Sequence, residues 1–148
     1  MKKILLISSL YALTFVACKK SSTSDNNNNP CTLSASSFVG NYKMTAQVSI
    51  VNGVSTDIFN DPSQIDPCFK DNIYTFNANG TYATTEGVDV CNPSNAETGT
   101  WALNGTSISI NSSGRVDVGT ISEFNCSSFK IIDTTDPSET LIITFARQ

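Results

Sequence analysis

The feature that most constrains this chain is residues 68–91, where two segments rich in Tyr, Phe, Thr, Ile and Val flank an Asn-Ala-Asn-Gly turn. Asn and Gly tolerate the positive φ angles of tight turns, so the turn ending at Gly80 predicts a β-hairpin. Side chains alternate along a strand, which places Tyr74, Phe76 and Tyr82 on one face. A single hairpin cannot bury such a face, so the rest of the chain is expected to close over it.

The same hairpin brings two cysteines together. A two-residue turn pairs residues whose numbers sum to 159, the sum for Cys68 and Cys91, and a three-residue turn with a glycine bulge shifts the pairing by one. Either turn predicts the disulfide Cys68–Cys91. One cysteine belongs to the export signal described below, so elimination predicts Cys31–Cys126 as the second disulfide. A zinc site is the weaker alternative, because the sequence has no Cys-x-x-Cys pair and no histidine.

The first residues predict export. Two lysines precede an apolar stretch at 4–16, which is shorter than the roughly 20 residues that span a bilayer. Ala17 and Cys18 follow, and the segment resembles a bacterial lipoprotein signal, in which a small residue precedes a cysteine that receives lipid. We therefore expect removal of residues 1–17, lipidation of Cys18 and attachment to the lipid bilayer. The expected location is the cell envelope, at the outer membrane, with the leaflet left open.

Residues 18–30 predict a lipidated flexible tether, because nothing after Cys18 in this range is apolar. Residues 31–148 then form the folded domain, a common size for a single domain. The net charge of −4, the pI near 4.6 and the lack of a Lys/Arg cluster argue against a nucleic-acid partner. The lack of histidine removes the commonest general base and the commonest metal ligand.

Most of the folded domain is predicted to be strand. An alternating apolar pattern places five side chains on the buried face of the first strand: Tyr42, Met44, Ala46, Val48 and Ile50. Tight turns are predicted at Asn52-Gly53, Asn104-Gly105 and Asp136-Pro137-Ser138. Besides the central hairpin, strands are expected at 54–59, 98–103, 106–111, 116–124, 129–134 and 140–146, and a helical turn only within 31–38. The prediction is an all-β, up-and-down antiparallel barrel of eight or nine strands, whose closure removes the exposed edges of an open sheet.

Metal binding and catalysis have weak support. Four acidic residues before the central hairpin could hold calcium but lack the spacing of a calcium loop: Asp57, Asp61, Asp66 and Asp71. Four others could form a carboxylate pair for glycoside cleavage, though none has a distinctive context: Glu86, Glu97, Glu123 and Glu139. We therefore expect no metal, no cofactor, no catalytic residue and no enzymatic activity.

Two segments carry a family likeness. Phe-Val-Gly-Asn-Tyr-Lys-Met at 38–44 resembles the opening Gly-x-Trp strand of lipocalins, with Tyr42 in place of Trp. The run 68–82, followed by Cys91 and by Gly-Thr-Trp-Ala-Leu at 99–103, resembles the lipocalin-like domain of bacterial lipoproteins. This resemblance implies a small antiparallel barrel, tethered by lipid, that serves as a binding module for an unidentified ligand.

Five aromatic residues are the candidate ligand-binding set: Tyr42, Tyr74, Phe76, Tyr82 and Trp101. The last four are expected to form one contiguous wall, since consecutive strands are usually neighbours. The bulky residues of so short a chain favour a mostly filled interior. Binding of a small apolar or amphipathic molecule is the first functional hypothesis, and a non-catalytic structural or interaction module of an envelope complex, with a filled barrel, is the second. Polar residues in a roomy barrel would favour the first, and a filled barrel with an exposed apolar patch the second.

Overall fold

The computed structural model describes residues 31–148. The predicted signal at 1–17, the tether at 18–30 and the lipidation of Cys18 lie outside the described residues. Within residues 31–148, no helix has the length and apolar character needed to cross a bilayer. All the elements described below belong to one barrel domain.

Nine strands and two short helical segments make up the domain. In chain order they are α1 (Ala35–Phe38), β1 (Gly40–Val51), β2 (Val54–Asp57), the 3₁₀ turn η1 (Pro67–Phe69), β3 (Ile73–Phe76), β4 (Thr81–Thr85), β5 (Glu97–Asn104), β6 (Ser107–Ser112), β7 (Arg115–Ser122), β8 (Ser128–Asp133) and β9 (Glu139–Arg147). The predicted strands all occur, with small shifts of their ends.

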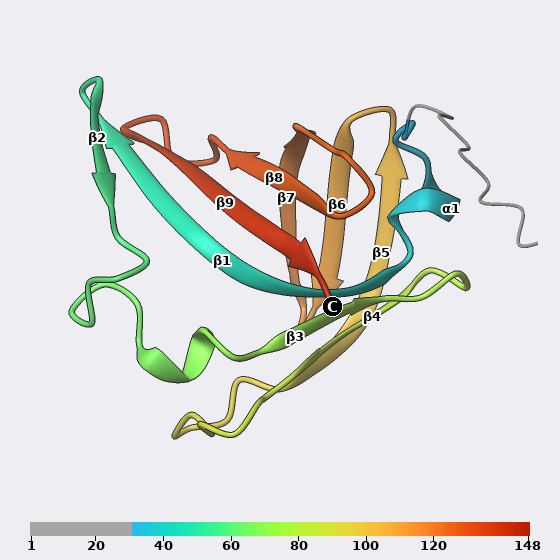
Figure 1. Ribbon diagram of the computed structural model, residues 1–148, viewed down its shortest axis with the longest axis horizontal. Coiled ribbons are helices and arrows are strands. Elements are labelled where there is room, and N and C mark those ends of the chain that lie inside the picture. Colours follow the sequence, from blue (N-terminus) through green and yellow to red (C-terminus); the bar gives the residue numbers. More distant parts are fainter. Residues whose placement is uncertain (1–30) are drawn as a thin grey trace, which may run out of the picture.

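The sheet closes on itself. Strands β3 to β9 pair antiparallel with their neighbours in sequence, and β1 pairs with both β3 and β9, which completes an eight-stranded barrel (Figure 1). The short strand β2 is the ninth, and it pairs only with the end of β1, at Val48–Val51. Closure leaves the eight barrel strands without a free edge over most of their length, and it confirms the predicted all-β, up-and-down fold.

The turns follow the glycine and asparagine positions. Asn52 and Gly53 both have positive φ, 52° and 76°, as a tight two-residue turn requires. In the central hairpin Phe76 pairs with Tyr82, which is the register of the turn with a glycine bulge. Gly80 supplies the positive φ of 79° at that bulge. The β6–β7 turn, which was not predicted from the sequence, also ends in a glycine, Gly114.

The prediction for the buried face of β1 is wrong beyond Met44. A β-bulge at Thr45 shifts the register against β9, and one extra residue exchanges the two faces of a strand. Ala46, Val48 and Ile50 are consequently only half-buried. Instead Ser49 turns inward, where it is buried and hydrogen-bonded to Glu139, and Gln47 lines the interior.

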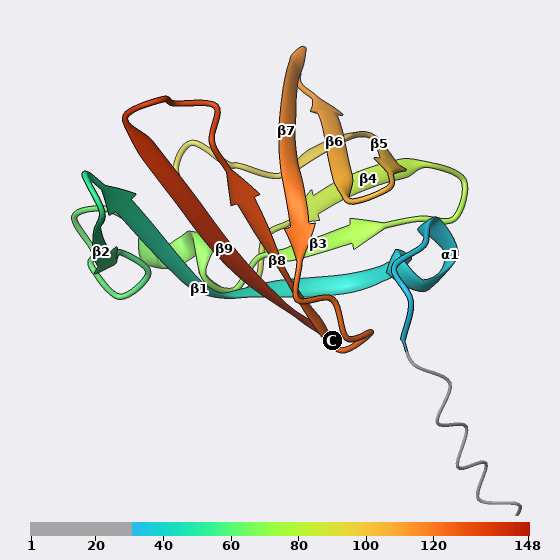
Figure 2. The same ribbon diagram turned by 90° about the horizontal axis from the view of Figure 1, so that it is seen from above.

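Helix α1 closes one end of the barrel (Figure 2). Ser34 begins it with a reciprocal capping box, its hydroxyl accepting from the Ser37 N–H while Ser37 accepts from the Ser34 N–H. Phe38, at the last helical position, is fully buried. Its ring lies 4.7–6.1 Å from five others: Tyr42, Phe76, Trp101, Phe124 and Phe129. This aromatic cluster fills the α1 end of the barrel.

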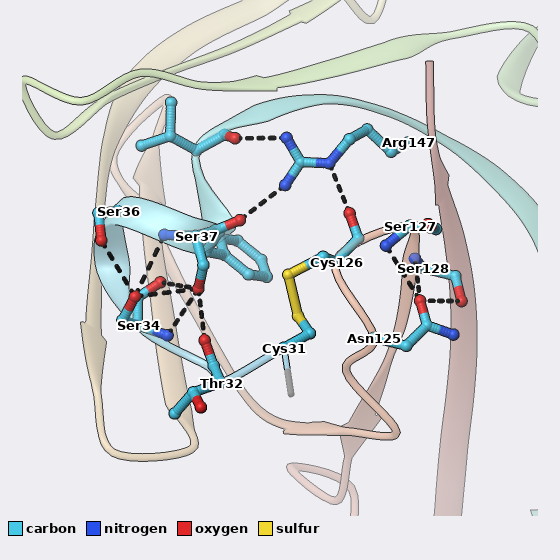
Figure 3. The surroundings of a disulfide bond; sticks show 12 residues. Cys31, Thr32, Ser34, Ser36, Ser37, Asn125, Cys126, Ser127, Ser128 and Arg147 are labelled. Carbon is cyan, nitrogen blue, oxygen red and sulfur yellow. Dashed lines mark hydrogen bonds between the residues drawn. A yellow bond between two sulfur atoms is a disulfide. The ribbon is translucent and has the colours of Figure 1, made fainter. Parts of the chain in front are cut away.

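Arg147 fastens α1 to the end of β9 (Figure 3). Its guanidinium donates hydrogen bonds of 2.7 Å to the carbonyls of Ser37, Val39 and Cys126, and a fourth to the Tyr42 hydroxyl. A Cβ at Gly40 would lie 2.5 Å from the Nη1 of Arg147. Glycine at that position therefore makes room for the guanidinium.

The second predicted disulfide stabilises the same end. Cys31, just before α1, is bonded to Cys126 between β7 and β8, with Cα atoms 5.8 Å apart (Figure 3). The predicted pairing is confirmed. Together with the hydrogen bonds of Arg147, this bond attaches the segment around α1 to the β7–β8 loop and to the end of β9.

Candidate ligand-binding cavity

The other end of the barrel is hollow. A cavity of about 790 Å³ lies between the strands and is open to solvent on one side. Its apolar lining comes from six of the barrel strands and from the segment before β3: Met44, Ile65, Phe69, Phe76, Ile108, Ile110, Val118, Ile131, Leu141, Ile143 and Phe145. The expectation of a mostly filled interior is therefore right for the α1 end and wrong for the opposite end.

The cavity exists because the large side chains are unevenly distributed. The rings gather around Phe38, whereas the open end has mainly aliphatic and small polar side chains facing inward. Eight strands form a barrel just wide enough either to be filled by side chains or to hold one small ligand. Here the barrel is filled by side chains at one end and leaves a space the size of a small ligand at the other.

The five candidate ligand residues divide between the two ends. Tyr74, Phe76 and Tyr82 line the cavity. Tyr42 does not, because it is buried at the closed end, where its hydroxyl donates to the Phe38 carbonyl at 2.8 Å. Trp101 also lies outside the lining, and its Nε1 donates to the Asn77 carbonyl at 3.0 Å.

The aromatic wall forms in part. Phe76 touches both Tyr82 and Trp101, with ring centroids 5.3 and 5.5 Å apart. Tyr74 instead packs edge-on against Phe145 of β9, at 5.2 Å. Strand β1 lies between β3 and β9, so the Tyr74 ring reaches over β1 toward β9 and not along its own strand. The predicted wall is confirmed for three residues, and the placement of Tyr74 in it was wrong.

The two cavity tyrosines present neutral hydroxyls. The Tyr82 hydroxyl lies 2.6 Å from the Thr84 hydroxyl, which also lines the cavity. Burial raises the pKa of Tyr82 and of Tyr74, and the Asn72 amide beside Tyr74 opposes its rise in part. Both groups are therefore protonated at physiological pH and can donate or accept a hydrogen bond.

The segment between β2 and β3 partly covers the mouth. Asp66 caps η1 through the Cys68 N–H, and Ile65 and Phe69 beside it line the cavity. The disulfide Cys68–Cys91 ties this segment to the loop after β4, with Cα atoms 5.3 Å apart. The predicted pairing is confirmed, although neither cysteine lies in a strand, because the β3–β4 pairing ends at residues 73 and 85.

Glu86 organises the loop on the other side of the mouth. Its carboxylate accepts hydrogen bonds from the Ser94 hydroxyl at 2.6 Å and from the N–H groups of Cys91 and Asn95 at 3.0 and 3.1 Å. These bonds, the one from Ser94 foremost, lower the pKa of Glu86. Glu86 therefore fixes the conformation of the loop between β4 and β5, which places Asn95 at the cavity.

Several polar lining residues were not predicted from the sequence, among them Gln47, Asn72 and Asn95. Asn72 could have been found, because it shares the even-numbered face of Tyr74 and Phe76. The Thr45 bulge hides Gln47, and Asn95 lies in a loop, where periodicity carries no signal.

The acidic residues considered for calcium act locally. Asp57, Asp61 and Asp66 each accept a backbone N–H two residues ahead. Asp71 accepts the Asp89 N–H at 2.9 Å, which is the main reason for its lowered pKa. Between residues 31 and 148, no group of three or more acidic or cysteine side chains is arranged to hold a metal ion.

A closed antiparallel barrel of eight strands, plugged at one end and hollow at the other, is the architecture of a small-molecule binding barrel. Residues 38–131 match the family model of the lipocalin-like domain. Because this match covers more than half of the sequence, the chain belongs to the lipocalin-like domain family. No curated protein matches the chain.

Proposed function

We propose that the protein is a lipid-anchored lipoprotein of the cell envelope whose barrel binds a small apolar or amphipathic molecule. The observation that carries this proposal is the cavity. Its volume of about 790 Å³ falls within the range of roughly 300–1,000 Å³ that small-molecule sites occupy. Aliphatic and aromatic side chains form the larger part of its lining, and polar and charged side chains form the rest. Apolar walls with polar groups that orient the ligand are typical of such sites.

The cavity favours binding over the alternative of a structural module with a filled barrel. Exposed apolar side chains do occur on β7, where Val116 is 59% exposed and Val118, which also borders the cavity, is 46% exposed. Two valines on one strand make a small patch compared with the few hundred Å² that a functional apolar surface covers. Polar residues in a roomy barrel were expected to favour ligand binding, and the hollow end has such residues in its lining. The proposed role is non-catalytic.

The anchor is proposed from the sequence alone. The apolar stretch followed by Ala17 and Cys18 supports lipidation of Cys18, and acyl chains contribute about 0.8 kcal/mol per buried CH₂. We expect Cys18→Ser to lose incorporation of a fatty-acid analogue and to move from the membrane fraction to the soluble fraction. Wild-type protein that stays unlabelled yet membrane-bound would contradict this part of the proposal.

Binding is tested by blocking the cavity. Ile110 lines it, so Ile110→Trp should fill part of the space, whereas Val116→Trp adds the same ring to the outer surface as a matched control. The apolar fluorophore N-phenyl-1-naphthylamine should bind the wild type and Val116→Trp saturably. We expect its affinity for Ile110→Trp to fall at least tenfold, with thermal unfolding confirming that each variant folds. Equal affinity for all three proteins, or no saturable binding, would refute the proposal.

A further inference from the structure

Asn72 is an unusual residue in this cavity. Its side chain is fully buried and lines the cavity directly before β3. Among residues 31–148, neither its Nδ2 nor its Oδ1 has a hydrogen-bond partner. Leaving a buried donor or acceptor unpaired costs about 1–3 kcal/mol, so a protein retains such a group at a cost that needs a reason.

The surroundings of Asn72 supply further hydrogen-bonding groups. The side-chain oxygen of Asn95 is also buried without a partner in the described chain, and Asn95 lines the same cavity. Tyr74 lies beside Asn72, and the amide is close enough to lower the pKa of the Tyr74 hydroxyl without meeting hydrogen-bond geometry. These three residues form a neutral polar patch, here called the Asn72 patch, in the wall of the cavity. The patch offers both donors and acceptors.

The charge of the lining is unfavourable to an anion. Four carboxylates and one guanidinium, formally −3, contribute to it: Asp66, Glu97, Asp117, Asp133 and Arg115. The single cation is already paired with a carboxylate of the lining, Asp117, at 2.9 Å. The guanidinium of Arg147 lies at the closed end and is used by three backbone carbonyls. A carboxylate ligand would therefore be desolvated without a counter-charge, which is costly.

We propose that the cavity selects amphiphiles with an uncharged head that both donates and accepts hydrogen bonds, such as a fatty alcohol or a fatty amide, and that Asn72 contacts this head. The proposal rests on the proposed ligand-binding function and specifies its ligand class. The apolar chain of the ligand occupies the aliphatic part of the cavity. The amide of Asn72 then donates to and accepts from the head, which satisfies both of its unpaired atoms.

The wild-type protein tests the selectivity without any substitution. Decanol, decanamide, decanoate and decylammonium share one chain length and differ only in the head, and each can compete with N-phenyl-1-naphthylamine at neutral pH. We expect decanol and decanamide to bind at least tenfold more tightly than decanoate. Equal or tighter binding of decanoate would overturn the proposal. A preference for decylammonium would also overturn it, because the acidic lining would then recognise the head.

The Asn72→Leu variant tests the contact itself. Leu has a similar shape but no polar atom, so decanol affinity should fall about tenfold while decane affinity stays the same or rises. Asn111→Leu is the matched control, because Asn111 lies exposed on β6. In ¹⁵N-labelled wild type, the Asn72 side-chain amide signal should shift with decanol and not with decane. Unchanged decanol affinity in Asn72→Leu, or an amide signal that decanol leaves in place, would overturn the proposal.

These outcomes distinguish a failure of the proposed ligand-binding function from a failure of the proposed contact between Asn72 and the ligand head. If N-phenyl-1-naphthylamine and decane do not bind, the proposed function fails and this inference fails with it. If they bind at the site that Ile110→Trp blocks, but the head has no effect on affinity, only the role of the Asn72 patch is refuted. The wild-type series and the amide signal give this answer even where Asn72→Leu does not fold.

Discussion

Replacing Phe38 by Ala should remove the centre of the packed end of the barrel. Phe→Ala in a protein core costs about 3–5 kcal/mol through lost burial and the space left behind. Phe38 is fully buried and its ring contacts five other rings at 4.7–6.1 Å. Well-oriented aromatic pairs contribute about 0.5–1.5 kcal/mol beyond burial. We therefore expect a loss in the upper half of the range, about 4–5 kcal/mol.

Urea unfolding followed by the fluorescence of Trp101 measures this loss. Trp101 is a suitable probe because its ring lies 5.5 Å from that of Phe38 and it is the single tryptophan of the chain. Phe69→Ala is the matched control at the hollow end. Phe69 is 39% exposed and borders the cavity, so its removal leaves little new empty space within packed atoms. Its cost should be less than half that of Phe38→Ala.

Two results would refute this reasoning. A loss below about 2 kcal/mol for Phe38→Ala would be too small for a residue at the centre of a close-packed core. A loss for Phe69→Ala equal to that for Phe38→Ala would show that both ends are packed alike. Either result would contradict the division of the barrel into a filled and a hollow half.

The two remaining predictions concern the disulfides and alkaline pH. The disulfide of Cys31 spans 95 residues and that of Cys68 spans 23, so opening the former by paired Ser substitutions should cost about 1 kcal/mol more by loop entropy; urea unfolding that shows the reverse order would contradict this. The folded-state pKa of all three tyrosines in 31–148 is raised, mainly by burial. The stability that they contribute is present below pH 10 and is lost as pH rises, by up to about 1.4 kcal/mol per pH unit for each tyrosine. Phenolate absorbance should therefore appear together with unfolding, and its appearance in folded protein near pH 10 would show that the hydroxyls are exposed.

Local chemistry made most of the strands and turns predictable. Positive φ at Asn52, Gly53 and Gly80 is a property of those residues, and period-two alternation is visible within each strand. The disulfide Cys68–Cys91 followed from the central hairpin, because cysteines on both sides of a hairpin meet whether or not the strands extend to them. The candidate site was harder to predict, since Tyr42 and Trp101 lie on inward faces at the wrong end of the barrel.

The amino-acid sequence by itself determined that the domain is a succession of short antiparallel strands with aromatic inward faces. Only the tertiary structure decided where the barrel is full and where it is hollow. The reason is that the size of a cavity depends on the summed volume of the inward-facing side chains from eight strands. The Thr45 bulge in β1 changes which side chains of that strand face inward. The unpaired amide of Asn72 is likewise a property of all the groups around it, so no stretch of sequence near Asn72 could have revealed it.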